Sequence, residues 1–554
     1  MFAKDFKKWD TILGWVSFAI AFIVYAITVE PTGSFWDAGE YISTSAKLQV
    51  GHPPGAPLLQ MIGAFFAMFA FGDPSKIALM VNAVSVVSSA FAVLFTFWTI
   101  TNLVQKMIAK DKTITNSKAI AILGSGLVGA LAFTFSDSFW FNAVETEVYA
   151  MASLIMALLL WLGLKWTDNL DDPRGHRWLL LICFLVGLTF GIQFMGFLAI
   201  PSIGLLYYFK KYKNTTVKNF LLANIVVIAF LILVYKFSLT YVLELFGWSE
   251  VFFINEIGLP FNSGTIIMGL LFIAAFYFGL RYTRKNNYYS ANTIVLCMMF
   301  VFLGFSSWLM LPIRANAKTV VNENNPADAR ALLAYYNREQ YPGVESPVYG
   351  AYYSDTFAPA GEDKDDSPKY EKDLKLGKYV IVNHYKDAIQ GPNKKHVGVL
   401  PRMWSDQHAE NYMRYFGPLD FRIKSEYISN NELRDAVNQF KTAYSQGELN
   451  TDQYIRFLRE FGEYIEVEPP TVWQNIKYLF EFQFGYMYMR YFMWNFVGRQ
   501  NDVQGRYDEN GHWLSGIGFM DSLRLGSQKN LPSDWENNKG RNTYFFLPLL
   551  LGII

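Results

Sequence analysis

Long apolar runs separated by short polar stretches dominate the first 311 residues of the chain. Most of these runs come close to or exceed the roughly 20 mostly apolar residues that a helix needs to cross a bilayer. They cover residues 11–29, 55–71, 77–103, 119–135, 148–164, 178–209, 218–243, 264–280 and 292–311. The pattern predicts an α-helical membrane protein that crosses the bilayer many times.

The basic residues between these runs predict which of them cross. They gather at Lys4 to Lys8 and within residues 106–118, 165–177, 210–218 and 281–285. Cytoplasmic loops carry an excess of Lys and Arg, so an even number of crossings should separate neighbouring clusters.

Two of the runs must then deviate from a single crossing. Run 55–71 is short and begins among prolines, so we interpret it as an interfacial helix on the outer side. Run 178–209 is basic at both ends and holds glycines in its middle, so we interpret it as two short crossings with a turn near Gly191 to Gly196. The prediction is about nine crossings within residues 1–311, a cytoplasmic N-terminus and a first outer loop over residues 30–76.

The rest of the chain has the composition of a soluble domain. Residues 1–311 hold 20 basic and 16 acidic side chains, whereas residues 312–554 hold 28 and 31. We therefore predict an outer domain over residues 312–541, mixed α/β or mainly α. Residues 542–554 are expected to begin a further membrane helix that continues beyond the sequence. The net charge of +1 gives no indication of nucleic-acid binding.

Carboxylates concentrate in the two predicted outer loops. Asp37 and Glu40 are three residues apart and would share one face of a helix. Glu145 and Glu147 are two apart, so only one of them is expected to face a common site if the segment is helical. A carboxylate in such a place can act as a general base. The alternative is that these groups are solvated loop residues, with Asp37 capping a helix.

The motifs around these carboxylates resemble the GT-C membrane glycosyltransferases, and within them a protein O-mannosyltransferase-like family that is widespread in Gram-negative bacteria. The resemblance rests on segments spread over nearly the whole chain: Phe35 to Glu40, Gly51 to Leu58, Trp140 to Tyr149, Pro312 to Ala315, Asn322 to Pro326 and Arg541 to Leu551. It implies a GT-C-type bundle in the bacterial inner membrane with its active site facing the periplasm.

The resemblance also implies an activity and roles for individual residues. A sugar, mannose in the first place, would pass from a polyprenyl-phosphate donor to Ser or Thr hydroxyls of exported proteins, with inversion. Asp37 would be the base, and Glu40 would orient it or contact the acceptor. The residues expected to bind substrate are Trp36, His52, Asn142, Glu145, Glu147, Arg314, Lys539 and Arg541.

Several of these assignments have alternatives. His52 would contact sugar or phosphate, or else brace the proline turn that follows it. Arg314, Lys539 and Arg541 would bind the donor phosphate or merely extend to the membrane interface. No metal or other cofactor is assigned, although the four outer-loop carboxylates leave a divalent ion unresolved. The competing functions are glycosylation of a lipid or polysaccharide on the same fold, and a membrane transporter or scaffold.

Overall fold

The computed structural model describes residues 2–109, 113–172, 174–236, 240–341, 348–351, 362–389, 391, 394–401, 419–503 and 510–554. The chain divides into two compact units. The first comprises Met1–Tyr341, Lys372–Tyr379 and Leu551–Ile554, and the second comprises Pro342–Glu371 and Val380–Leu550. The first unit therefore continues past the change in composition at Leu311.

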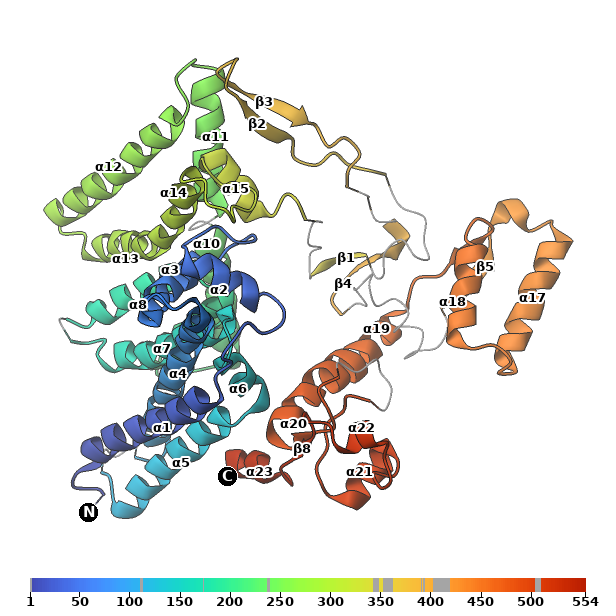
Figure 1. Ribbon diagram of the computed structural model, residues 1–554, viewed down its shortest axis with the longest axis horizontal. Coiled ribbons are helices and arrows are strands. Elements are labelled where there is room, and N and C mark those ends of the chain that lie inside the picture. Colours follow the sequence, from blue (N-terminus) through green and yellow to red (C-terminus); the bar gives the residue numbers. More distant parts are fainter. Residues whose placement is uncertain are drawn as a thin grey trace. The chain divides into compact units, whose positions relative to one another are not determined.

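The first unit is helical, with most of its helices in the predicted apolar runs (Figure 1). Its long helices are α1 (Phe6–Thr28), α4 (Ile77–Ile108), α5 (Asn116–Thr134), α7 (Val148–Asp168), α10 (Val217–Tyr235), α12 (Ser263–Lys285) and α13 (Tyr289–Phe305). Among the described residues, 7 helical segments are long and apolar enough to cross a membrane: Phe6–Thr28, Pro74–Ile108, Asn116–Thr134, Val148–Asp168, Val217–Tyr235, Ser263–Lys285 and Tyr289–Asn316. The chain thus has the make-up of a polytopic α-helical membrane protein.

The run over residues 178–209 is broken. Helix α8 (His176–Thr189) ends two residues before Gly191, and α9 (Ala199–Lys211) begins after the 3₁₀ turn η3 (Phe194–Leu198). These two helices have 14 and 13 residues, which explains why neither is among the spanning candidates although both were counted among the nine predicted crossings. The side chain of Trp308 is buried, and its Nε1 donates a hydrogen bond to the carbonyl of Phe190 at the break, at 2.8 Å.

Two other runs differ from simple crossings. Residues 55–71 form α3 (Pro57–Ala67) and the turn η1 (Met68–Ala70), which together are too short to span. Within the run over 218–243, α10 ends at Tyr235 and α11 (Tyr241–Asn255) begins at Tyr241; residues 237–239 lie outside the described part of the chain. The apolar run ends before Glu244, and Glu250 follows within α11, so the hydropathy pattern did not predict this helix.

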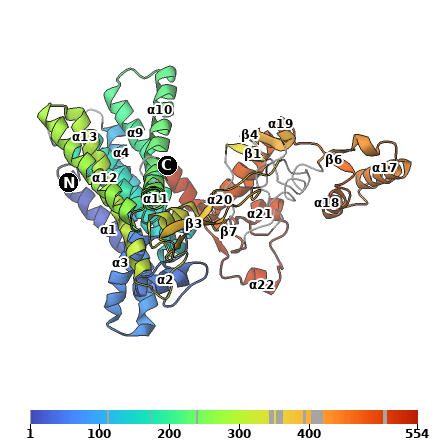
Figure 2. The ribbon, with the colours of Figure 1, turned by 90° about the horizontal axis from the view of Figure 1, so that it is seen from above.

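Helix α4 lies between α1, α5 and α7, and α9 pairs with α10 in the same way that α12 pairs with α13 (Figures 1 and 2). Helices α8 and α13 approach closely at two glycines. A Cβ on Gly187 would overlap the carbonyl of Val301, and one on Gly304 would overlap that of Phe184. Glycine at both positions therefore permits backbone-to-backbone packing between these helices.

Two short helices follow the last apolar segment of the first unit. Helix α14 (Met310–Asn316) follows the last apolar segment, and α15 (Ala329–Asn337) packs against α11. The tip of the hairpin β2–β3 (Lys369–Asp373, Lys378–Asn383) also belongs to this unit. The backbone of Tyr379 exchanges two hydrogen bonds with the side chain of Asn255, at 2.8 and 2.9 Å.

The second unit combines short helices with two-stranded antiparallel ladders. The ladders pair β1 (Tyr349–Ala351) with β4 (Val397–Val399), β5 (Phe421–Ile423) with β6 (Ile465–Val467), and β7 (Gly498–Arg499) with β8 (Asn542–Thr543). The helices are α17 (Asn431–Ser445), α18 (Thr451–Glu460), α19 (Val472–Tyr478), α20 (Arg490–Phe496), α21 (Gly518–Leu525) and α22 (Ser533–Glu536), with the π-helix η9 (Leu479–Met489) joining α19 to α20. Helix α23 (Leu547–Ile553) is divided between the two units after Leu550. Strands β5 and β6 pack with α17, α18 and α19 around one apolar core.

Candidate functional site

The two predicted outer loops are held together at one end of the helical bundle. Asn82 of α4 donates hydrogen bonds from Nδ2 to the carbonyls of Glu30 (2.7 Å) and Thr32 (2.9 Å) in the first loop. Its Oδ1 accepts a hydrogen bond from Thr146 Oγ1 (2.5 Å) in the second loop. The backbone N–H of Glu30 also donates to the carbonyl of Val144 at 2.9 Å. These bonds bring both acidic loops to the same side.

Asp37 stands at the start of α2 (Ala38–Ala46) and its side chain is available to a ligand. It occupies the N-cap position, yet its carboxylate makes no capping hydrogen bond. The side chain is 57% exposed. The preceding Trp36 has a left-handed backbone (φ 61°) and is 89% exposed. The alternative that Asp37 serves only to cap a helix is therefore not what the geometry shows.

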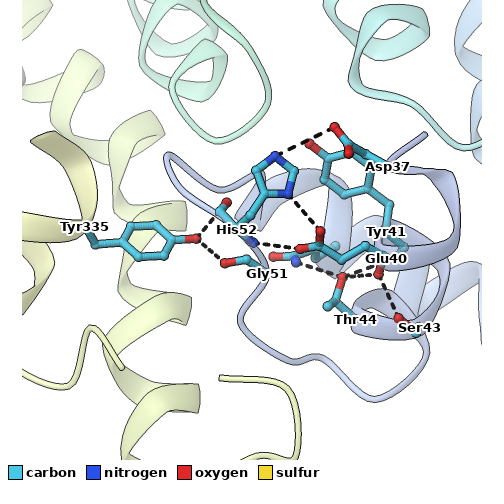
Figure 3. A network of polar contacts seen from close by, with 9 residues as sticks. Asp37, Glu40, Tyr41, Ser43, Thr44, Gly51, His52 and Tyr335 are labelled. Carbon is cyan, nitrogen blue, oxygen red and sulfur yellow. Dashed lines mark hydrogen bonds and ion pairs between the residues drawn. The ribbon is translucent and has the colours of Figure 1, made fainter. Parts of the chain in front are cut away.

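Glu40 and His52 form a tightly bound pair beside Asp37 (Figure 3). The backbone N–H of His52 donates to Glu40 Oε1 at 2.6 Å, and His52 Nδ1 lies 2.9 Å from Glu40 Oε2. The other ring nitrogen, Nε2, lies 3.8 Å from Asp37 Oδ2. The imidazole thus stands between a carboxylate that fixes its orientation and one that faces solvent.

The charges of this pair support each other. Hydrogen bonding to Glu40 raises the pKa of His52 against the opposing effect of burial, and the negative charges of Glu40 and Asp37 add to the rise. Burial alone would raise the pKa of Glu40, but the hydrogen bonds from His52 outweigh it, so the pKa of Glu40 lies below its ordinary value. Each member of the pair therefore favours the charged form of the other, the imidazolium of His52 and the carboxylate of Glu40.

Gly51 gives Glu40 the space that this arrangement needs. A Cβ at position 51 would overlap Glu40 Oε1. We expect Gly51→Ala to displace the Glu40 carboxylate and to lower both the melting temperature in detergent and the activity of the site. Gly39→Ala is the matched control: position 39 lies next to Glu40, but no atom of the described residues lies within 4 Å of the added Cβ. This substitution should stabilise helix α2 slightly. Equal effects of the two substitutions would contradict the account.

The second outer loop contributes two buried carboxylates with different surroundings. Glu145 Oε2 accepts a hydrogen bond from Ser34 Oγ at 2.5 Å. Glu147 precedes α7 and is 8% exposed. Burial first, and then the charges of Asp37 and Glu145, raise the pKa of Glu147 to about 7. Glu147 is thus the member of the pair that is electrostatically coupled to Asp37, while Glu145 fixes the first loop.

The raised pKa of Glu147 predicts a pH-dependent stability. Between about pH 4.5 and 7 the folded chain keeps a proton that the unfolded chain has released, so the free energy of unfolding falls as the pH rises through this range. The fall is at most on the order of 3 kcal/mol. Glu147→Gln stays neutral, so its melting temperature relative to the wild type should be higher at pH 8 than at pH 5. Thermal unfolding in detergent at both pH values tests this prediction. The same difference in melting temperature between Glu147→Gln and the wild type at pH 5 and pH 8 would refute it.

The remaining predicted residues have other surroundings. Arg314 donates from Nε to the carbonyl of Leu48 (2.5 Å) and from Nη2 to that of Lys47 (3.3 Å), so it holds the end of α2. Asn142 donates to the carbonyl of Ser138 within α6 (Asp137–Ala143). Lys539 and Arg541 belong to the second unit, and their binding of phosphate stays a prediction.

Two residues of the site were not predicted, and both come from beyond the last spanning segment. Glu323 lies near the pair, since the charges of Glu40 and His52 both act on its pKa, which burial raises. Tyr335 is fully buried and its hydroxyl contacts the backbone of Gly51 and His52. Neither residue has a local sequence signal that would connect it to a loop more than 260 positions away, apart from the place of Glu323 in the Asn322 to Pro326 motif.

Asp37, Glu40 and His52 also offer atoms for a metal ion. One ligand atom from each lies within 4.8 Å of the others, which is a spacing that a divalent cation could draw together. A metal would take His52 in its neutral form and would compete with the Glu40 hydrogen bond.

A solvent-facing carboxylate with an oriented histidine, at one end of a polytopic helical bundle, defines a candidate acid–base site of a membrane enzyme. Residues 37–216 match a family model described as the protein O-mannosyl-transferase TMEM260 N-terminal domain, and residues 343–480 match a family of unknown function, DUF8416. The first match begins at Asp37 and contains Glu40, His52, Glu145 and Glu147.

Two relatives carry the same name. The chain is 28% identical over 145 residues to protein O-mannosyl-transferase tmem260 of Dictyostelium discoideum, covering 26% of this chain and 16% of the relative. It is 26% identical over 173 residues to protein O-mannosyl-transferase TMEM260 of Mus musculus, covering 31% and 22%. The matches thus span about a fifth or less of these longer relatives. No solved structure matches the chain. Over residues 37–216 the chain is thus similar to the N-terminal domain of protein O-mannosyl-transferases.

Proposed function

We propose that the chain is a membrane glycosyltransferase that moves a sugar, mannose in the first place, from a polyprenyl-phosphate donor to Ser or Thr hydroxyls of exported proteins. The observation that carries the proposal is the exposed Asp37 carboxylate beside the Glu40–His52 pair, at the first residue of the segment similar to O-mannosyltransferases. The proposal includes a GT-C-type bundle with this site on the periplasmic side of a bacterial inner membrane.

The chemistry is a single inverting displacement. The acceptor oxygen forms a bond to the anomeric carbon while the bond from that carbon to the phosphate oxygen breaks. The hydroxyl proton passes to Asp37, and polyprenyl phosphate leaves with the electron pair. The pKa of His52 is raised by Glu40, which favours its charged form, and its Nε2 lies 3.8 Å from Asp37 Oδ2, where it would orient that carboxylate and place positive charge near the reacting groups.

The arrangement of the loops supports the proposed sidedness. The two acidic loops are bonded to each other through Asn82, and the basic clusters lie in the other connections. By the excess of Lys and Arg in cytoplasmic loops, the acidic end of the bundle faces outward. A polyprenyl donor would keep its lipid tail in the bilayer and present its sugar at this end.

The alternatives differ in the acceptor or in the type of activity. The same site would serve a lipid or polysaccharide acceptor, and a transporter would instead need ionisable groups near the bilayer midplane. The test incubates the purified chain with polyprenyl-phosphate-mannose and three acceptors: a Ser/Thr-rich peptide, a glycolipid and a polysaccharide. Mannose on the peptide supports the proposal, mannose on another acceptor supports the first alternative, and no transfer to any acceptor contradicts glycosyl transfer.

A further inference from the structure

The segment that follows α14 is bonded to the turn that carries His52. The backbone N–H of Val50 donates to the carbonyl of Val321 (3.2 Å), and that of Glu323 donates to the carbonyl of Val50 (3.1 Å). The side chain of Gln49 accepts a further bond from Val321 N–H at 2.7 Å. Residues 49–50 and 321–323 therefore form a short parallel pairing within the first unit.

Tyr335 of α15 adds a further contact to this turn, at Gly51 and His52. Its side chain is fully buried, and its hydroxyl donates toward the carbonyls of Gly51 (2.6 Å) and His52 (3.1 Å) (Figure 3). The backbone N–H of His52, next to the Gly51 carbonyl, is the group that donates to Glu40 Oε1 at 2.6 Å. The two hydrogen bonds therefore act on opposite ends of one peptide unit.

The turn leaves no spare room around this hydroxyl. Gly55, whose N–H closes the turn on the His52 carbonyl at 2.9 Å, has a left-handed backbone with φ +77°. A Cβ at position 55 would lie 2.7 Å from the Tyr335 hydroxyl oxygen. Glycine at this position is thus required both by the backbone conformation and by the approach of Tyr335.

We infer that Tyr335 is a positioning residue of the Asp37–Glu40–His52 site, which holds the Gly51–His52 peptide so that His52 stays bonded to Glu40. The inference rests on the proposed function for its effect on catalysis, and on the contacts alone for its effect on the turn. Helix α15 lies outside residues 37–216, the segment similar to O-mannosyltransferases, and under this inference it helps to position the site. Small displacements of groups near the reacting atoms cost rate out of proportion to their size.

The test compares Tyr335→Phe with Tyr336→Phe in the full chain in detergent. Both substitutions remove one hydroxyl from α15, but the Tyr336 hydroxyl contacts Tyr235 and Thr240, each at 3.3 Å, and not the turn. Hydrogen exchange measured by mass spectrometry should rise on the order of fivefold at residues 50–55 in Tyr335→Phe and stay unchanged in Tyr336→Phe. For sugar transfer, kcat should fall about tenfold or more in Tyr335→Phe with the donor KM unchanged.

A second pair of variants covers the case that Tyr335→Phe fails to fold. Gly55→Ala should push the hydroxyl away and give the same exchange pattern and loss of kcat, whereas Gly72→Ala, which has a similar φ of +84° and no atom within 4 Å, should not. Unchanged exchange at residues 50–55, or raised exchange with unchanged kcat, overturns the inference. A wild-type chain that transfers no sugar overturns the proposed function, while the exchange pattern still decides whether Tyr335 holds the turn.

Discussion

Replacing Asp37 by asparagine is expected to lower sugar transfer by about 10²–10⁴-fold, the range that a positioned general base contributes. Asparagine keeps the shape of the side chain but cannot accept the acceptor's proton. The Asp37 side chain is 57% exposed and makes no capping hydrogen bond, so folding should be preserved. The measurement is the initial rate of mannose transfer to a Ser/Thr peptide, with the melting temperature in detergent recorded for each variant.

The control for this substitution is Asp73→Asn in the same predicted outer loop. Asp73 bonds only to its neighbours in the contacts that the structure describes, with Ser75 at 2.7 Å and Lys76 at 3.1 Å. Its loss should leave transfer within about twofold of the wild type, since an exposed ion pair contributes little. Transfer by Asp37→Asn at the wild-type rate would remove Asp37 as the base, whatever the control does.

Replacing Glu40 by glutamine is expected to lower transfer by about 10- to 100-fold, because hydrogen bonds to charged groups are worth about 1.5–3 kcal/mol. The carboxylate accepts from both the backbone and the ring of His52. A glutamine side chain has a single acceptor oxygen, so its amide N–H₂ would face one of these donors. His52 would then lose its fixed orientation toward Asp37. Transfer rates and melting temperatures over a range of pH measure the effect.

The pH dependence of this variant follows from the two shifted groups. The raised pKa of His52 gives stability that is present below its ordinary value of 6.5 and is lost as pH rises through the raised value. The lowered pKa of Glu40 gives stability that is present above 4.5 and is lost as pH falls through the lowered value. The melting temperature of the wild type should therefore exceed that of Glu40→Gln by the largest margin between about pH 4.5 and 6.5. Glu371, which forms an exposed ion pair with Lys369, provides the control variant Glu371→Gln. A difference in melting temperature between the wild type and Glu40→Gln that does not change with pH, or an equally large difference for Glu371→Gln, would contradict this prediction.

The membrane helices could be predicted because their signal is local. Runs such as 77–103 and 119–135 are long and apolar enough to define a helix without reference to the rest of the chain. The break near Gly191 follows from glycine content and charge at both ends. Helix α11 was missed because Glu250, which accepts hydrogen bonds from Asn262 and Thr265, is a buried acid that local hydropathy cannot tell from a loop residue.

The site was predictable in its residue types but not in its assembly. Asp37, Glu40 and His52 stand close in sequence, and the helix period alone places the two acids on one face. The pairing of Glu40 with the backbone of His52 depends on Gly51, whose role appears only when the turn is seen. The contacts of Tyr335 and Glu323 join segments separated by more than 260 residues, and no pattern of periodicity carries that information.

Arg314 illustrates the same limit. Its position directly after the last apolar run was apparent, and a positive charge there suited a phosphate. In the structure its guanidinium bonds to the carbonyls of Lys47 and Leu48, where it also suits the negative end of the α2 dipole. A basic residue at the membrane boundary can therefore stabilise the fold rather than bind phosphate, and only its tertiary contacts distinguish the two roles.

The most direct test of the central claim is the mass of a Ser/Thr peptide after incubation with the purified full chain and polyprenyl-phosphate-mannose. The account predicts one added hexose on a hydroxyl side chain with the wild type, and about a hundredfold or more less of this product with Asp37→Asn in the same time. A peptide of unchanged mass with the wild type, or the same amount of added hexose with both proteins, would contradict it.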